Sequence, residues 1–272
     1  MSDLISPGQD GGTLRSDPRA PRRVRHAEAR RRTLVVAGTE KISAHMMRVT
    51  LTGDLEGFKS LGFDDHVKIF LPDESLGAKS DTPNLIGRDF TPRRHDPVAN
   101  TLDIDFAIHD AGPASRWAAR VQAGQTLTVG GPRGSFIIPM SYDWHLLIGD
   151  ETGLPAIGRR LSELPAGARA VAVIEVDTPS DEIALPTQAN ATIVWAHRND
   201  EEPGQSDELA KALARLTLPA GDYYGWVACE SRIAKELRHQ LIAKHGANPK
   251  WIRASGYWRR GTAAVHEMHD GE

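Results

Sequence analysis

The apolar residues of this chain change their spacing once, near Pro139, and that change limits the fold more than any other feature. Before Pro139, short segments alternate apolar and polar residues and are separated by turns rich in Gly, Pro, Asp and Asn. This period of two is typical of strands in an antiparallel sandwich or barrel. After Pro139, short apolar runs alternate with stretches of helical periodicity, which indicates an open parallel sheet of the α/β class.

The predicted elements follow from these two patterns. Before the boundary, the expected strands are 34–36, 47–52, 66–71, 101–108 and 126–129, with one helix over 113–120. After it, the expected strands are 145–149, 170–176, 191–196, 224–228 and 251–253, and the expected helices are 154–164, 206–216 and 231–244. We therefore expect two domains, an antiparallel β-barrel over 29–139 and an open parallel α/β domain over 140–272.

Residues 1–28 are rich in Gly, Pro, Ser, Asp and Arg and have almost no apolar pattern, which predicts a disordered tail. Arginines gather at its end, and a solvated tail is favoured there over an arm that binds a polyanion. The net charge of −3 argues against a nucleic-acid-binding protein. No apolar run is long enough to span a membrane, and the first thirty residues lack the apolar core of a signal peptide.

The chain has one cysteine, Cys229. One thiol cannot form an intramolecular disulfide, a four-cysteine iron–sulfur site or a zinc site built from several thiolates. No metal site is expected in the protein, and a reducing cytoplasm is the expected location.

Two segments of the first half carry residues suited to a flavin nucleotide. The first holds Arg88, Phe90 and Thr91, which offer a guanidinium for a diphosphate, an aromatic face and a hydroxyl. Taken alone, a polar loop with one buried Phe is the favoured interpretation of this segment. The second runs from His109 through Gly112 to Trp117, where a glycine turn opens a helix whose first N–H groups can bind an anion. Taken alone, an N-capped surface helix explains it equally well.

Three further segments contain glycine turns or paired aromatics. Glycines at 130–134 allow a close approach of the backbone to a ligand, although a plain β-turn is the simpler interpretation. Segment 149–157 lies where the first strand of an open α/β sheet meets its first helix, the usual place for a dinucleotide. Asp150 and Glu151 would repel phosphate there, so neither is expected to face it. Tyr257 and Trp258, flanked by arginines, could cover a flat cofactor or pack on the surface.

In this order, the segments resemble the ferredoxin-reductase-type flavoproteins and, more narrowly, the siderophore-interacting proteins. The similarity covers about residues 33–262 and rests on these motifs: Arg-Asp-Phe-Thr-Pro-Arg, His-Asp-Ala-Gly-Pro-Ala-Ser-Arg-Trp-Ala, Gly-Pro-Arg-Gly-Ser-Phe, Gly-Asp-Glu-Thr-Gly-Leu-Pro-Ala-Ile, Glu-Val-Asp and Gly-Tyr-Trp-Arg-Arg-Gly. Two positions depart from the family pattern. Phe90 stands where tyrosine is usual, and Cys229 precedes Glu230 where glycine is expected.

The resemblance implies an FAD-binding barrel followed by a domain that receives NAD(P)H. It implies cofactor contacts for Arg88, Phe90, Thr91, His109, Gly112, Ala114, Ser115, Trp117 and Trp258. It places Asp150, Glu151 and Thr152 at the entrance for the nicotinamide. No side chain needs to act as a catalytic acid or base, because the flavin carries the chemistry.

The implied reaction is reduction of a ferric siderophore by NAD(P)H in the cytoplasm, with release of ferrous iron. The alternatives are a general NAD(P)H reductase that acts on free flavin or a partner protein, and a non-catalytic FAD-containing protein that binds siderophores. A monomer is expected. Neither the siderophore nor the choice between NADH and NADPH follows from these residues.

Basic residues in three of the cofactor-proximal segments suggest how an anionic ferric siderophore could be held. Lys68, Arg133 and Arg259 are expected to line its pocket, with ordinary surface contacts as an equal alternative. An NADP 2′-phosphate usually meets an arginine, and Arg198, shortly after a predicted strand, is the candidate.

Overall fold

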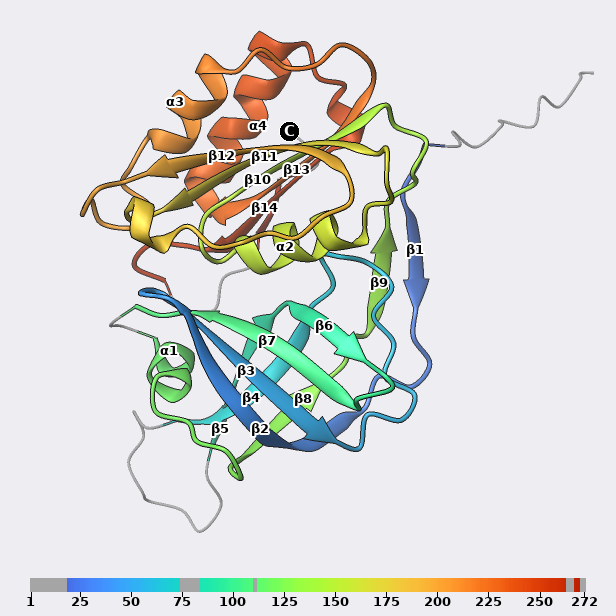
Figure 1. Ribbon diagram of the computed structural model, residues 1–272, viewed down its shortest axis with the longest axis vertical. Coiled ribbons are helices and arrows are strands. Elements are labelled where there is room, and N and C mark those ends of the chain that lie inside the picture. Colours follow the sequence, from blue (N-terminus) through green and yellow to red (C-terminus); the bar gives the residue numbers. More distant parts are fainter. Residues whose placement is uncertain (1–18, 74–83, 110–111, 263–266, 270–272) are drawn as a thin grey trace, which may run out of the picture.

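The computed structural model describes residues 19–73, 84–109, 112–262 and 267–269. Two lobes follow one another along the chain, a curled antiparallel sheet and a parallel sheet flanked by helices (Figure 1). Both parts of the predicted fold class are therefore confirmed. The predicted boundary near Pro139 falls between the last strand of the first lobe, which ends at Ile137, and the first parallel strand, which starts at Trp144. None of the described helices is both long and apolar enough to cross a membrane.

Seven antiparallel strands form the first lobe in the order β5-β4-β8-β2-β3-β7-β6. Their bounds are β2 (Arg31–Ser43), β3 (Met46–Gly53), β4 (Val67–Pro72), β5 (Leu85–Phe90), β6 (Pro92–Asp96), β7 (Thr101–Ala107) and β8 (Thr126–Gly130). The edge strands β5 and β6 are separated in sequence by Thr91 alone, so the sheet must curl until its two edges lie close at this residue.

The barrel core comes from the alternation seen in the sequence. Leu34 and Val36 in β2 are buried, while Thr33 and Val35, which alternate with them, are exposed. The same alternation in β3, β4 and β7 fills the interior of the barrel with aliphatic side chains. The short helix α1 (Pro113–Ala118) closes one end, because Ala114 and Ala118 pack onto this core.

The second lobe contains a sheet in the order β12-β11-β10-β13-β14-β15. All pairs in it are parallel except β14 with β15. Its elements are β10 (Trp144–Gly149), α2 (Leu154–Glu163), β11 (Arg169–Val176), η2 (Pro179–Asp181), β12 (Asn190–His197), α3 (Glu208–Arg215), β13 (Tyr223–Glu230), α4 (Ser231–His245), η3 (Pro249–Trp251), β14 (Ile252–Trp258) and β15 (Glu267–Met268). The strand order reverses between β10 and β13, so a topological switch point lies at their carboxyl ends.

Helices cover both faces of this sheet. α2 lies between the sheet and the barrel, whereas α3 and α4 cover the opposite face (Figure 1). The core under α2 also includes Met46 and Phe63 of the first lobe, so one hydrophobic core joins the two lobes.

Two glycines allow the turn between β10 and α2 to lie directly on the neighbouring strand. A Cβ atom at Gly149 or Gly153 would be only 2.7 or 2.4 Å from the carbonyl oxygen of Ala228 in β13. Side chains at these positions would push the turn away from the switch point. The requirement here is for space, since neither residue has a positive φ.

The structure corrects the prediction for the end of the tail. Arg22–Arg25 form strand β1, which pairs antiparallel with β9 (Gly134–Ile137). The Nε2 atom of His26 is 2.9 Å from the Ser135 hydroxyl, which extends the contact. Backbone pairing needs no apolar side chains, so an arginine-rich segment can form a strand where the side-chain pattern gives no sign of one. Residues 1–18 of the predicted tail lie outside the described residues.

Candidate functional site

The segment predicted to hold the flavin lies at the junction between β5 and β6. Arg88 is half-buried near the end of β5, and its Nη1 atom donates to the carbonyl of Gly87 at 2.9 Å. Thr91 is buried, and its side chain is hydrogen-bonded to the hydroxyl of Tyr257 in β14. Burial raises the pKa of that Tyr257 hydroxyl, so the hydroxyl stays protonated at neutral pH. The Arg88–Thr91 segment is therefore fixed between the barrel and the last parallel strand.

Phe90 and Trp117 belong to one aromatic cluster. The centre of the Phe106 ring lies 4.4 Å from the centre of the Phe90 ring and 5.5 Å from the centre of the Trp117 ring. Two residues predicted from separate motifs are thus brought together through a third one in β7. Phe90 lies two residues after Arg88 in β5, so the cluster places apolar side chains close to Arg88.

The turn before α1 is closed by its own hydrogen bonds. The Ser115 hydroxyl accepts from the backbone N–H of His109 at 2.6 Å and donates to the carbonyl of the same residue at 2.7 Å. Gly112 lies so close to the His109 ring that a Cβ atom would be 2.9 Å from its Cε1 atom. The hydroxyl of Ser115 is engaged within the turn, so the anion-binding groups left here are the first-turn N–H groups, including those of Ala114 and Ser115.

At the switch point, the Asp150 carboxylate is buried and turned inward. Its Oδ1 atom accepts from the N–H and the hydroxyl of Thr152 at 2.9 and 2.6 Å, and its Oδ2 atom accepts from the indole N–H of Trp258 at 2.8 Å. Burial raises the pKa of Asp150, and these hydrogen bonds counteract part of that rise. Trp258 is thereby attached to the turn after β10.

Glu151 is also buried and is paired with Arg198, whose Nη1 atom lies 2.5 Å from its Oε1 atom. The Arg198 Nε atom is also 3.7 Å from Asp177. Arg198 is only 6% exposed, so the structure contradicts its prediction as the residue that meets a 2′-phosphate. Its charge is used to offset buried carboxylates, because an unpaired charge is costly to bury.

The three residues predicted to line the siderophore pocket lie on both lobes. Lys68 in β4 is paired with Asp89 across the sheet at 2.7 Å, and it lies opposite Gly130, three residues before Arg133. Arg133 is exposed. Arg259, just after β14, is paired with Glu267 at 3.2 Å. Lys68 thus lies on the strand next to β8, Arg133 lies in the turn between β8 and β9, and Arg259 comes from the other lobe.

Several residues that the sequence did not single out join the lobes beside this site. Arg159 in α2 donates to the Ser60 hydroxyl at 2.7 Å and to the Pro92 carbonyl at 3.0 Å, directly after Thr91. Asp64 accepts from Trp226 at 3.3 Å and pairs with Arg253 at 2.9 Å. These residues are far apart in the sequence, so no sequence motif predicts their contacts. The contacts depend on how the two lobes pack against each other.

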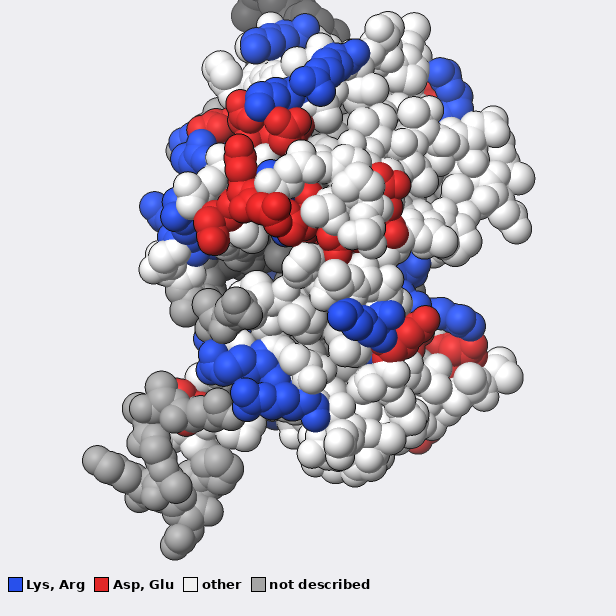
Figure 2. All heavy atoms as spheres, turned by 60° about the vertical axis from the view of Figure 1, so that its left-hand side comes forward, with Lys and Arg blue, Asp and Glu red and all other residues white. Residues whose placement is uncertain are grey.

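Charge is unevenly distributed on the surface. Figure 2 shows acidic side chains gathered across the α/β lobe and a separate group of Lys and Arg side chains on the barrel below it. A net charge of −3 for the whole chain therefore hides local regions of opposite sign.

Comparisons with known proteins fit this arrangement of two lobes. The family model described as "Siderophore-interacting FAD-binding domain" matches residues 35–136, and the one described as "Siderophore-interacting protein" matches residues 142–261. The chain is 35% identical over 260 residues to an NADPH-dependent ferric-chelate reductase of Escherichia coli, covering 90% of this chain and 99% of that protein.

Two other proteins agree. A ferric vibriobactin reductase, ViuB, of Vibrio cholerae is 32% identical over 244 residues, covering 83% of this chain and 89% of its own. The crystal structure of a siderophore utilization protein from T. fusca superposes with a TM-score of 0.82 at 37% identity, covering 90% of this chain and 98% of that one. The similarity therefore extends over both lobes.

Proposed function

The chain belongs to the siderophore-interacting protein family, and from this premise we propose that it is an FAD-containing reductase that passes electrons from NAD(P)H to a ferric siderophore. One observation carries the proposal. The flavin motif at Thr91 is hydrogen-bonded to Tyr257 of the parallel sheet, so a cofactor on the first lobe would face the strand ends where dinucleotides bind. Within the proposal, residues 29–139 bind FAD and residues 140–272 receive the nicotinamide nucleotide.

The residues present fit FAD. Arg88 offers a guanidinium, which suits a diphosphate, and the first turn of α1 offers N–H groups. The closeness of Gly112 to the His109 ring leaves no room for a side chain in that turn. Phe90 and Trp117 add an apolar wall. We assign Arg88, Phe90, Thr91, His109, Gly112, Ala114, Ser115 and Trp117 to FAD on this basis.

When bound, FAD supplies the exchange between a two-electron donor and iron(III), which accepts one electron at a time. The side chains of this protein hold and orient the reactants. Asp150, Glu151 and Thr152 shape the turn at the switch point, and Trp258 is fixed against it by its hydrogen bond to Asp150. Reduction itself loosens the metal, since hard oxygen donors hold iron(III) far better than iron(II).

Lys68, Arg133 and Arg259 are proposed to attract an anionic ferric siderophore. Because Lys68 and Arg259 are already paired with carboxylates, exposed Arg133 should contribute most. Arg133→Gln should raise the KM for an anionic ferric siderophore, and more at low salt than at high salt, because salt screens exposed charges. Flavin reduction by NAD(P)H should be unchanged. An equal KM in wild type and variant at low salt would remove Arg133 from the substrate site.

The proposal extends to a monomer that works in the cytoplasm, and both points stay predictions. Gel filtration with light scattering tests the first. The second is tested by fractionating cells that produce the tagged chain.

A two-step anaerobic experiment tests the main proposal. Purified protein should be yellow with about one FAD per chain, and NADPH or NADH should bleach it. The bleached protein should then be reoxidised by a ferric siderophore faster than by ferredoxin or free flavin. Colourless protein that cannot be reconstituted with FAD contradicts the proposal. Bleaching without preference for the ferric siderophore would instead indicate a general flavin reductase.

A further inference from the structure

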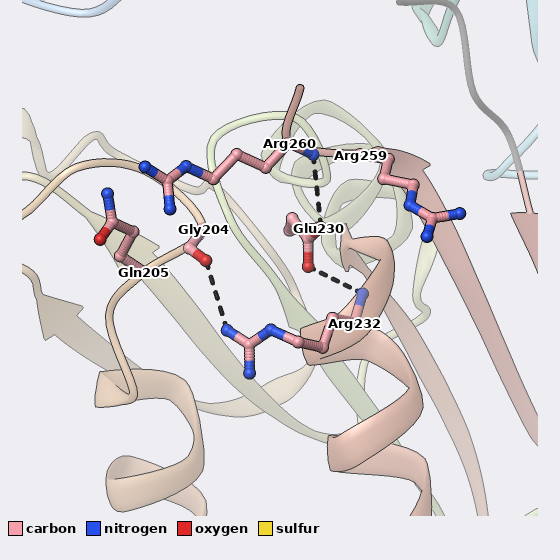
Figure 3. Close-up of a pocket in the computed structure, with 6 residues that line it drawn as sticks. All are labelled: Gly204, Gln205, Glu230, Arg232, Arg259 and Arg260. Carbon is pink, nitrogen blue, oxygen red and sulfur yellow. Dashed lines mark hydrogen bonds between the residues drawn. The ribbon is translucent and has the colours of Figure 1, made fainter. Parts of the chain in front are cut away.

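A pocket of ≈ 340 Å³ opens at the carboxyl edge of the parallel sheet, outside the motifs assigned above to FAD. Its walls come from the loop after β12, from the first turn of α4 and from the end of β14 (Figure 3). The residues that line it are Gly204, Gln205, Glu230, Arg232, Arg259 and Arg260. Two of these residues, Arg232 and Arg260, extend their guanidinium groups along the pocket, which points to an anionic ligand (Figure 3).

The loop after β12 reaches this pocket by crossing the edge of the sheet. β12 is separated from β13 by β11 and β10. Nevertheless, a Cβ atom at Gly204 would be 2.8 Å from the Trp258 ring and 3.0 Å from the Glu230 side chain. The loop therefore passes over the switch point, the place where open α/β sheets bind dinucleotides, and carries Gln205 with it.

The two consecutive arginines at the end of β14 point in different directions. Arg260 extends across the pocket toward Gln205, whereas Arg259 is directed away from it (Figure 3). The Arg260 guanidinium nitrogens lie 3.1 and 2.6 Å from the Gln205 side-chain oxygen in the amide orientation that pairs donor with acceptor. Arg232 closes the other side, where its Nη2 atom is 3.4 Å from the Gly204 carbonyl.

The one carboxylate in the pocket is engaged by backbone donors. Glu230 is 4% exposed and accepts from the N–H groups of Arg232, Ile233 and Arg260 at 2.7, 3.2 and 3.4 Å. Arg232 also pairs with Glu236 at 2.8 Å, but both side chains are more than half exposed, and such pairs are weak. Arg232 and Arg260 can therefore turn toward an incoming anion at little cost.

We propose that this pocket binds the 2′-phosphate of NADPH through Arg232, Arg260 and the Gln205 amide, and so makes the protein selective for NADPH over NADH. The inference rests on the proposed function. A phosphate monoester offers a dianion with several acceptor oxygens, which guanidinium groups bind in a forked geometry. Buried Arg198 is not available for this role. The exposed acids Asp200, Glu201 and Glu202 on the same loop repel phosphate, so the two arginines decide the preference.

Calorimetric titration of the FAD-loaded protein with adenosine 2′,5′-bisphosphate and with 5′-AMP tests the pocket without any turnover. The wild type should bind the bisphosphate at least about ten-fold more tightly than 5′-AMP. The double variant Arg232→Gln/Arg260→Gln should lose most of this difference and retain its affinity for 5′-AMP. Arg169→Gln, which removes an exposed charge at the amino end of β11, should bind like the wild type. When Arg260→Lys replaces Arg260→Gln in the double variant, part of the difference between the two ligands should be retained.

Anaerobic flavin reduction separates this inference from the proposed function. The double variant should raise the apparent Kd for NADPH by about ten-fold or more and leave that for NADH within about three-fold. Equal loss for both nucleotides would assign the pocket to the shared diphosphate and overturn the inference. An unchanged preference for NADPH, or a change only in the KM for the ferric siderophore, would overturn it too. If neither nucleotide bleaches wild-type flavin, the proposed function itself fails.

Discussion

At the scale of single residues, Arg88 and Arg94 allow a matched comparison, because they lie on the two edge strands of the barrel on either side of Thr91. Arg88 is half-buried in the proposed flavin motif, whereas Arg94 is exposed and paired with Asp96 at 2.7 Å. Both side chains carry the same charge, so replacing either one changes the net charge equally. A difference in FAD affinity between the two variants would therefore arise from the positions of the side chains. Arg88 is the side chain to which we assign the FAD diphosphate.

Arg88→Ala should weaken FAD binding by about 10- to 100-fold, because a hydrogen bond from a charged donor contributes roughly 1.5–3 kcal/mol. The measurement is equilibrium dialysis of the reconstituted protein against FAD. Arg94→Ala should bind FAD as the wild type does. Equal FAD affinity in the two variants would show that Arg88 does not contact the diphosphate.

Glu175, near the end of β11, is a buried carboxyl group that should make the free energy of unfolding depend on pH. It is 2% exposed, and burial, reinforced by Asp150 and Glu151, raises its pKa from 4.5 to about 8. Between these values the folded state holds a proton that the unfolded state has lost. The free energy of unfolding therefore falls as the pH rises from about 4.5 to about 8, and levels off above that.

Glu175→Gln should remove this dependence, because the amide keeps the shape of the side chain and does not ionise. Compared with the variant, the wild type should lose roughly 3–5 kcal/mol of stability between pH 5 and pH 9. Urea unfolding at several pH values measures the difference. The changed hydrogen bonding should shift the free energy of unfolding of the variant by the same amount at every pH. The test is therefore how steeply the free energy of unfolding changes with pH in each protein. Parallel pH profiles would mean that Glu175 is ionised in the folded protein at neutral pH.

At the scale of elements, β1 divides the amino-terminal region into two parts with different expected roles. It pairs with β9 over four residues, and the Arg23 guanidinium lies 5.7 Å from the centre of the Phe136 ring. Just before it, Arg19 forms an ion pair with Asp222. This segment covers the strand that follows Arg133 and connects it to the second lobe.

Removing residues 1–18 should therefore leave the melting temperature unchanged, whereas removing residues 1–28 should lower it by roughly 5–10 °C. The longer deletion leaves the N–H and C=O groups of β9 without partners and removes the contact with Asp222. Differential scanning fluorimetry of the two truncated proteins, both loaded with FAD, measures this. If the longer deletion melts like the full chain, β1 contributes nothing to stability.

Most elements could be predicted from the sequence because their side chains carry the pattern. The helices α2 and α4 differ from the predicted 154–164 and 231–244 by one residue each. β1, β5, β6 and β9 were missed as strands. β1 and β6 consist mostly of polar residues, and β1 and β9 pair with each other from far apart in the sequence. In the site, charge repulsion led us to expect that Asp150 and Glu151 do not face a phosphate, and both side chains are buried. The burial of Arg198 was not predicted, because it depends on an ion pair with Glu151, which is 47 residues away in the sequence.

At the scale of the whole molecule, polar contacts add to the hydrophobic core that joins the two lobes, and one of them lies next to the proposed flavin motif. The guanidinium of Arg159, in the helix between the lobes, donates to Ser60 and to the carbonyl of Pro92. The ion pair of Arg253 with Asp64 lies in the same interface. FAD binding and the joining of the lobes should therefore be coupled, because Pro92 follows Thr91 directly.

Replacement of Arg159 tests this coupling. Arg159→Met keeps an unbranched side chain but leaves the buried carbonyl of Pro92 and the part-buried carbonyl of Ser60 without this donor, which should cost roughly 2–4 kcal/mol. The wild type should unfold in one calorimetric transition, and the variant should show a separate, earlier transition of one lobe together with weaker FAD binding. Arg215→Met, on the exposed end of α3 away from the barrel, should behave as the wild type does. Were Arg159→Met to lower the melting temperature in a single transition with FAD affinity intact, Arg159 would stabilise the fold without linking the two lobes at the flavin site.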